Sequence, residues 1–154
     1  PGAQRYRPQS FDEIVGNTEA VDCLRKMARE QFLFHILLCG EPGSGKTSAI
    51  KCLARALLRE HYGKAVLELN AADDRGIDVV RAKIKSFAQE KVALPGDLPK
   101  IVILDEVEAM TEGAQQTLRR IFELYSHTTR FALACNNADK VIEPLQSRCN
   151  LVRV

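Results

Sequence analysis

A glycine-rich stretch between an apolar run and a helical run offers the clearest chemistry in the sequence. Residues 40–47 read Gly-Glu-Pro-Gly-Ser-Gly-Lys-Thr and fit the P-loop pattern at every fixed position. Glycine has no Cβ, so consecutive backbone N–H groups can turn inward toward an anion. Lys46 adds a point charge, the following helix adds the positive end of its dipole, and Thr47 offers a hydroxyl to Mg²⁺. This pattern predicts a cradle for the phosphates of a nucleotide.

A phosphate cradle of this kind needs carboxylates, and the apolar run 101–104 ends in two of them. We expect Asp105 to hold Mg²⁺ directly or through water, and Glu106 to orient or deprotonate the water that attacks the γ-phosphate. The predicted cofactors are therefore ATP and Mg²⁺, with Thr47 and Asp105 as metal ligands. The residues expected to contact the nucleotide are Glu41, Pro42, Gly43, Ser44, Gly45, Lys46, Thr47, Ser48, Asp105 and Asn136.

Three further polar residues leave alternatives open when only their position is considered. Asn136 closes an apolar strand and could bond the γ-phosphate or the attacking water, or be a simple turn asparagine. Asn70 ends a neighbouring strand and could hold Glu106 away from its catalytic position. Arg148 comes so late in the chain that it is either a surface charge or a residue that reaches a neighbouring subunit's phosphate.

The composition indicates a single domain. With 154 residues, 45% of them hydrophobic and 27% charged, the chain can bury one core but not two comfortable ones. A net charge of +2 is too small to argue for a polyanionic partner. The five cysteines, without a Cys-x-x-Cys pair, are expected to be buried in a reducing compartment, and the three scattered histidines predict no metal site. No apolar run nears the roughly 20 residues of a membrane span, which predicts a soluble intracellular protein without a membrane partner.

Strand patterns alternate with helix patterns along the chain. Helices are predicted from an N-cap at Thr18 to about Gln31, over 46–58, from Ile77 to Ala88, and from an N-cap at Thr111 to Tyr125, with a helical turn over 141–145. Strands are predicted over 36–39, 66–69, 101–104, 131–135 and about 151–154, each apolar on both faces. We expect an α/β fold of the P-loop NTPase class over residues 18–154, with a central parallel five-stranded sheet flanked by helices. The candidate residues follow strand ends, where such sheets bind ligands.

Short motifs spread over the whole chain resemble one family. They are Tyr6-Arg7-Pro8 and the segments 13–17 (Glu-Ile-Val-Gly-Asn), 67–71 (Leu-Glu-Leu-Asn-Ala), 74–81 (Asp-Arg-Gly-Ile-Asp-Val-Val-Arg), 113–116 (Gly-Ala-Gln-Gln), 118–120 (Leu-Arg-Arg) and 142–149 (Ile-Glu-Pro-Leu-Gln-Ser-Arg-Cys). In this order they resemble the small subunits of replication factor C, the AAA+ clamp loader of eukaryotes and archaea. The Ser-Arg-Cys motif is specific to clamp loaders among AAA+ proteins.

The resemblance implies roles for individual residues. Asn136 would be the sensor asparagine, Asn70 would restrain Glu106, and Arg148 would be the finger offered in trans to the adjacent subunit's ATP. The residues implied to surround the adenine lie in an N-terminal arm over 1–17 and are Tyr6, Arg7, Pro8, Val15 and Gly16.

The resemblance also implies contacts with DNA. The starts of the third and fourth predicted helices would face a central chamber and follow the DNA backbone. This points to Arg81, Lys85, Thr111 and the backbone near Ile77. Such contacts would be directed at phosphates, tolerant of sequence and weakened by salt. From the residues alone, a solvated helix flank is the simpler interpretation of Arg81 and Lys85.

The chain departs from the family pattern at several places. The family usually has Asp-Glu-Ala-Asp where residues 105–108 read Asp-Glu-Val-Glu, and Pro-Pro-Gly-Thr-Gly-Lys where 41–46 read Glu-Pro-Gly-Ser-Gly-Lys. Ala72 replaces a usual serine. The helical lid and collar that follow in the family are expected to be absent from this chain.

The combined expectation is an ATPase subunit of a DNA sliding-clamp loader. With the other subunits of a hetero-pentamer it would open a ring-shaped sliding clamp, contacted around residues 87–98, and place it on primer-template DNA. The expected location is the nucleus, or the cytoplasm if the protein is archaeal. Two other interpretations stay open: a non-catalytic nucleotide-binding scaffold subunit of the same type of ring, and another AAA+ DNA motor such as a branch-migration helicase.

Overall fold

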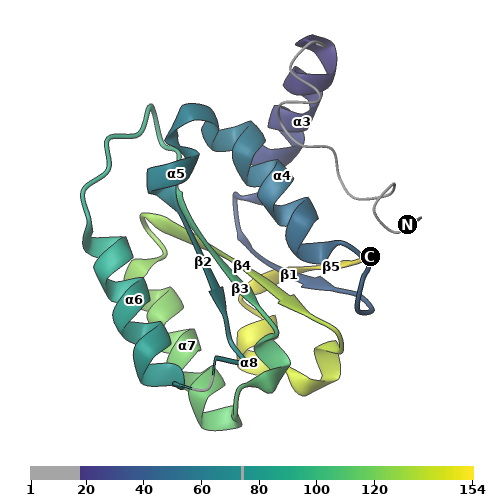
Figure 1. Ribbon diagram of the computed structural model, residues 1–154, viewed down its shortest axis with the longest axis vertical. Coiled ribbons are helices and arrows are strands. Elements are labelled where there is room, and N and C mark those ends of the chain that lie inside the picture. Colours follow the sequence, from purple (N-terminus) through teal and green to yellow (C-terminus); the bar gives the residue numbers. More distant parts are fainter. Residues whose placement is uncertain (1–17, 74) are drawn as a thin grey trace.

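A computed structural model describes residues 18–73 and 75–154, in which strands and helices alternate (Figure 1). The strands are β1 (His35–Cys39), β2 (Val66–Asn70), β3 (Lys100–Asp105), β4 (Thr129–Cys135) and β5 (Cys149–Arg153). The α-helices are α3 (Thr18–Gln31), α4 (Lys46–Leu58), α5 (Tyr62–Ala65), α6 (Ile77–Gln89), α7 (Glu112–Tyr125) and α8 (Glu143–Gln146). The predicted N-terminal arm and Asp74 lie outside the described residues.

The five strands form one sheet in the order β2-β3-β4-β1-β5, and every neighbouring pair is parallel. The parallel five-stranded sheet predicted from the sequence is therefore confirmed. Its register sets Asn70 beside Asp105 and Cys39 beside Cys135. The polar residues that follow these strands consequently meet at one edge of the sheet.

Helices cover both faces of the sheet, with α6 and α7 side by side on one face and α4 on the other (Figure 1). Successive side chains along β1 point to opposite faces of the sheet and pack into two separate cores. In β1, Leu37 belongs to the core beneath α6 and α7, whereas Ile36 and Leu38 belong to the core beneath α4. The apolar runs of β1, β3 and β4 thus serve two faces at once, as expected for buried parallel strands.

Two of the predicted strands are less buried than expected. The outer strands β2 and β5 have exposed or half-buried side chains, because each pairs with a neighbour on one edge alone. Strand β5 also begins at Cys149, two residues before the predicted start, since the backbone already pairs there with His35 of β1. Met27, an apolar residue of α3, is half exposed.

The ends of the main helices follow local chemistry. Thr111 caps α7 as predicted, because its Oγ1 accepts a hydrogen bond from the Ala114 N–H at 3.1 Å. Helix α4 begins directly after Gly45, whose φ of 81° is left-handed. The short helix α5, which the sequence patterns did not indicate, joins α4 to β2. None of the helices in the described residues is long and apolar enough to cross a membrane.

Candidate functional site

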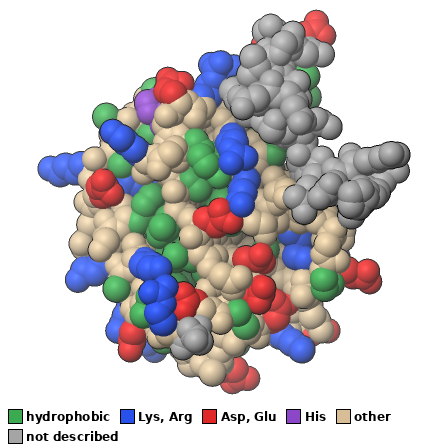
Figure 2. Space-filling view, in the orientation of Figure 1, with side chains coloured by type: hydrophobic (Ala, Val, Ile, Leu, Met, Phe, Trp, Pro, Cys, Tyr) green, Lys and Arg blue, Asp and Glu red, His purple; other side chains and the backbone are tan. Residues whose placement is uncertain are grey.

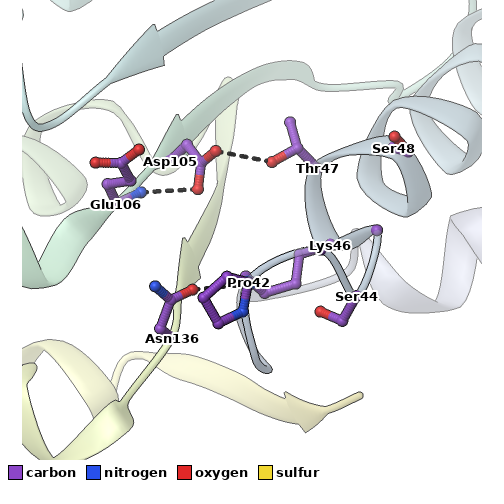
Figure 3. Close-up of a pocket in the computed structure, with 10 residues that line it drawn as sticks. Pro42, Ser44, Lys46, Thr47, Ser48, Asp105, Glu106 and Asn136 are labelled. Atoms are coloured by element: carbon purple, nitrogen blue, oxygen red, sulfur yellow. Dashed lines mark hydrogen bonds between the residues drawn. The ribbon is translucent and has the colours of Figure 1, made fainter. Parts of the chain in front are cut away.

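A cavity of about 610 Å³ opens at the edge of the sheet where the strands end (Figure 3). It is lined by Pro42, Gly43, Ser44, Gly45, Lys46, Thr47, Ser48, Asp105, Glu106 and Asn136. The structure therefore brings together most of the residues predicted to contact the nucleotide, from the loop after β1 and the ends of β3 and β4. Glu41 is in the same loop and is exposed.

Glycines allow the loop that precedes α4 to turn. Gly43 has a φ of 82° and Gly45 a φ of 81°, a region that costs other residues roughly 1–2 kcal/mol. A Cβ at Gly40 would lie 2.7 Å from a side-chain carbon of Val154 and 2.9 Å from the Ser44 hydroxyl. The loop thus needs glycine for conformation at two positions and for space at a third.

Lys46 reaches back across the loop from the first turn of α4. Its Nζ donates hydrogen bonds to the carbonyls of Gly40 at 2.7 Å and Glu41 at 3.0 Å, and to Oδ1 of Asn136 at 3.0 Å. The side chain is 8% exposed. The ammonium group is therefore held at the floor of the cavity between the loop and the end of β4.

Two oxygen ligands suited to Mg²⁺ lie beside each other at this cavity. Thr47 Oγ1 donates to Oδ2 of Asp105 at 3.0 Å, and Asp105 Oδ1 accepts from the Glu106 N–H at 2.8 Å (Figure 3). No cluster of three or more His, Cys, Asp or Glu side chains in the described part of the chain could hold a metal by itself. A hydroxyl and one carboxylate fit Mg²⁺, which usually takes few protein ligands and completes its shell with phosphate and water.

Glu106 is held in an unusual backbone conformation. Its φ of 56° and ψ of 44° are left-handed, and such strain in a non-glycine residue often marks a functional site. Asn70 Nδ2 lies 3.4 Å from Glu106 Oε1, while Asn70 Oδ1 accepts from the Ala72 N–H at 2.8 Å. The structure thus places Asn70 beside Glu106, and the restraint that the resemblance implied stays a prediction.

Two residues of this region were not predicted from the sequence. Oε2 of Glu108 accepts hydrogen bonds from the backbone N–H groups of Asn136 and, at 3.1 Å, of Asn137. The buried amide of Gln115 donates to the Met110 and Lys140 carbonyls at 3.1 Å each, and accepts from a third backbone group. The sequence singled out Glu108 only as a departure from the family pattern and Gln115 only as part of a family motif, and neither signal indicated a contact with backbone groups.

Comparison with known proteins identifies the family of the chain. The ATPase family associated with various cellular activities (AAA) matches residues 36–153. The chain belongs to the AAA family. A nucleotide site at the P-loop follows from this membership, and the cavity lies there.

The chain is similar in sequence to proteins named as subunits of replication factor C. The chain is 58% identical over 153 residues to "Replication factor C subunit 4" of Schizosaccharomyces pombe, covering 99% of this chain and 45% of that one. It is 50% identical over 152 residues to "Replication factor C small subunit" of Saccharolobus solfataricus, covering 98% and 46%. The chain therefore spans less than half the length of these relatives.

Two solved structures share the AAA fold at low identity. A DNA polymerase III gamma subunit-related protein of Thermotoga maritima superimposes with a TM-score of 0.66 at 21% identity, over 87% of this chain and 45% of that one. The Thermotoga maritima RuvB Holliday junction branch migration motor gives 0.56 at 19% identity, over 96% and 48%. At such identities these matches speak for the fold alone.

Arg148 does not face its own P-loop in this AAA domain. It precedes β5, whose first residue pairs with His35 at the start of β1, so it lies at the opposite edge of the sheet from the cavity. A strand of five residues separates the two edges by roughly 16 Å. The Arg148 guanidinium instead lies 2.5 Å from Oε1 of Glu123, which also pairs with Arg119 at 2.9 Å.

The four predicted DNA contacts lie at the starts of α6 and α7 or along α6. Arg81 and Lys85 are exposed on α6, and Arg81 pairs with Asp78 at 2.9 Å. Ile77 is half-buried at the first turn, and Thr111 is the exposed cap of α7. Acidic and basic side chains are interspersed on the face in Figure 2, so no single-sign surface dominates that view. The adenine-contacting residues predicted in the arm lie outside the described residues.

Proposed function

We propose that this chain binds ATP with Mg²⁺ in the P-loop cavity and hydrolyses it as a subunit of a DNA sliding-clamp loader. The observation that carries the proposal is the convergence of Lys46, Thr47, Asp105, Glu106 and Asn136 on one cavity at the ends of three different elements. This set provides a cation, two metal-binding oxygens, a carboxylate for water and an amide, which are the groups that phosphoryl transfer to water requires.

The loop and Lys46 would bind the phosphates. In the structure Lys46 Nζ donates hydrogen bonds to two loop carbonyls and to Asn136, and Lys46 lines the cavity. Thr47 and Asp105 would hold Mg²⁺, which neutralises charge on the phosphates. Asn136 would orient either the γ-phosphate or the attacking water.

Glu106 would orient the attacking water and accept its proton. Asn70, at the end of the neighbouring strand β2, lies 3.4 Å from the carboxylate and would restrain it. We therefore propose Asn70 as a switch: while it holds Glu106, the carboxylate is less available to water, and a shift of Asn70 releases it.

Arg148 would act on the ATP of an adjacent subunit. Its position at the far edge of the sheet supports action in trans, because its own phosphate site lies beyond the length of β5. Such a finger contributes on the order of 10³ to 10⁵ in rate. Its ion pair with Glu123 would have to break or rearrange during assembly.

The proposed assembly follows from the relatives named replication factor C. Other subunits would complete a hetero-pentamer, the ring clamp would contact residues 87–98, and primer-template DNA would meet α6 and α7 through its phosphates. The N-termini of α6 and α7 follow β2 and β3, whose carboxyl ends lie at the same edge of the sheet as the cavity, and this supports communication between DNA and the ATP site. We propose a nuclear location, or a cytoplasmic one for an archaeal source.

The test is ATP turnover by the full-length chain in its assembled ring, with and without primed DNA and clamp. We expect DNA and clamp together to accelerate turnover, and Arg148→Ala to remove part of that acceleration. Lys140→Ala, a change of an exposed cation away from the cavity lining, is the control. Turnover that responds to DNA but ignores the clamp would indicate another AAA DNA motor. Nucleotide binding without any turnover would indicate a scaffold subunit.

A further inference from the structure

We propose that Glu108 is a positioning residue that fixes Asn136 in the cavity and links it mechanically to Glu106. The inference rests on the proposed ATPase function and deepens it, because it assigns a role to a carboxylate that does not line the cavity. The contacts of one side-chain oxygen and one backbone turn carry it.

The first step is the convergence of two amides on one oxygen. Oε2 of Glu108 accepts from the N–H of Asn136 and from the N–H of Asn137 at 3.1 Å. Hydrogen bonds to an ionised carboxylate are about twice as strong as neutral ones. Strand β4 ends at Cys135, so these two amides lie just beyond the last strand residue. Glu108 therefore supplies backbone hydrogen bonds directly after the last residue of β4.

The second step runs from that backbone to the cavity. Asn136 is exposed, and its side chain points toward Lys46, with Oδ1 3.0 Å from Nζ (Figure 3). Without the Glu108 contact, the described hydrogen bonds would hold the Asn136 backbone only through its carbonyl, which accepts from Cys39 Sγ at 3.6 Å, and the side chain would be positioned less tightly. The anchor at the Asn136 N–H consequently sets where the side chain meets a phosphate or water.

The third step joins Glu108 to Glu106. Glu108 lies in the 3₁₀ turn Val107–Ala109, which follows Glu106 directly, and the Ala109 N–H donates to the Glu106 carbonyl at 3.0 Å. This turn is short, and its Val107 side chain is fully buried. Glu106 and Asn136, which follow the different strands β3 and β4, are thus connected by one compact bridge that passes through Glu108.

A double-substitution cycle tests whether Glu108 acts through Asn136. In the assembled full-length protein, we expect Glu108→Ala to lower kcat about tenfold while ATP affinity changes less than about threefold. Glu108→Gln, which keeps an acceptor oxygen at the same reach, should restore most of the rate. Adding Glu108→Ala to Asn136→Ala should have almost no further effect. Glu60→Ala, an exposed glutamate in the turn after α4, is the control.

Two results would overturn the inference: independent, multiplicative rate losses in the double variant, or a Glu108→Ala protein that turns over ATP normally. A second measurement decides the geometry without turnover. In NMR spectra of the 154-residue chain, the Asn136 and Asn137 amide protons should have different chemical shifts in Glu108→Ala than in the wild type, and Glu60→Ala should leave both shifts unchanged. If wild-type turnover were absent, the proposed function would fail, while unchanged amide shifts would separately refute the Glu108 bridge.

Discussion

The ammonium group of Lys46 lies 3.0 Å from the side-chain oxygen of Asn136, although 90 positions separate the two residues in the chain. The contact exists because β1 and β4 are parallel neighbours in register at Cys39 and Cys135, so the segments after both strands leave the sheet together. The hydrogen bond joins the phosphate-binding loop to the proposed sensor.

Removal of the Lys46 ammonium should weaken nucleotide binding. We expect Lys46→Ala to lower the affinity for Mg·ATP by more than about tenfold, because the β- and γ-phosphates lose their point charge. Isothermal titration calorimetry measures this. Lys51→Ala is the matched control, since Lys51 is on the same helix but pairs with Glu68 at 2.9 Å. Equal losses in both variants would argue for a general effect of net charge.

Release of Glu106 from Asn70 should raise basal turnover. Asn70→Asp keeps the acceptor for the Ala72 N–H but removes the donor that reaches Glu106. We expect turnover without DNA to rise several-fold in this variant and in Asn70→Ala, with a smaller further stimulation by DNA. Steady-state ATPase assays measure both rates, and Asn150→Ala on the exposed edge of β5 is the control. A basal rate that falls or stays constant in both variants would refute the switch.

His35 should make the fold sensitive to mild acid. Burial, aided by Arg130 and Arg148, lowers the pKa of His35 to about 4 from 6.5. The neutral ring also accepts the Phe131 N–H at Nδ1, 3.1 Å away. The unfolded chain therefore binds more protons between these pKa values, and stability falls as pH drops from about 6.5 to about 4, by up to about 3 kcal/mol.

Urea denaturation at about pH 7 and about pH 4.5 measures this loss. We expect His35→Asn to show a shallower fall in the free energy of unfolding between the two pH values than the wild type. His61→Asn, a change of a partly exposed histidine paired with Glu60, should keep the wild-type slope. Parallel slopes in all three proteins would exclude His35 as the source.

Thiol reactivity should distinguish the cysteines. Burial raises the pKa of Cys135, next to Cys39 and Glu108, and that of Cys149 to about 12. Roughly one in ten thousand of such thiols is ionised at about pH 8. We expect an alkylating reagent to modify exposed Cys23 first, as read by mass spectrometry of peptides, and the buried thiols only after denaturation. Early modification of Cys135 would contradict the described packing around it.

Much of the fold could be predicted because apolar periodicity and position agree. The runs at β1, β3 and β4 are apolar at nearly every residue since both of their faces are buried, and the helix stripes show the usual spacing. Strand order was beyond reach, because the sequence does not show which strands lie at the edges. This explains why β2 and β5 were expected to be more buried than they are.

The P-loop could be predicted because its chemistry is contained in one continuous segment. The contacts of three other residues could not be predicted, because each residue bonds backbone groups that are far away in the sequence or in another element. These residues are Glu108, Gln115 and Lys100. Lys100, for example, is 5% exposed and donates to the Phe87 carbonyl at 2.7 Å, at the end of α6. Charged and amide residue types predict surface positions. Only the tertiary structure shows that these side chains bond backbone carbonyls or amides. Cys23 was expected to be buried because cysteine is usually a buried residue. It is exposed on α3, so residue type alone gave the wrong burial at this position.

The most direct test of the central claim compares Glu106→Gln with the wild type in the assembled full-length protein. The substitution keeps the size of the side chain and removes the proton-accepting charge beside Asp105. We predict that ATP affinity stays within about threefold while single-turnover hydrolysis falls by at least about a hundredfold, in the range typical of a lost general base. Hydrolysis at the wild-type rate would contradict the assignment of this cavity as an ATPase site that works through Glu106.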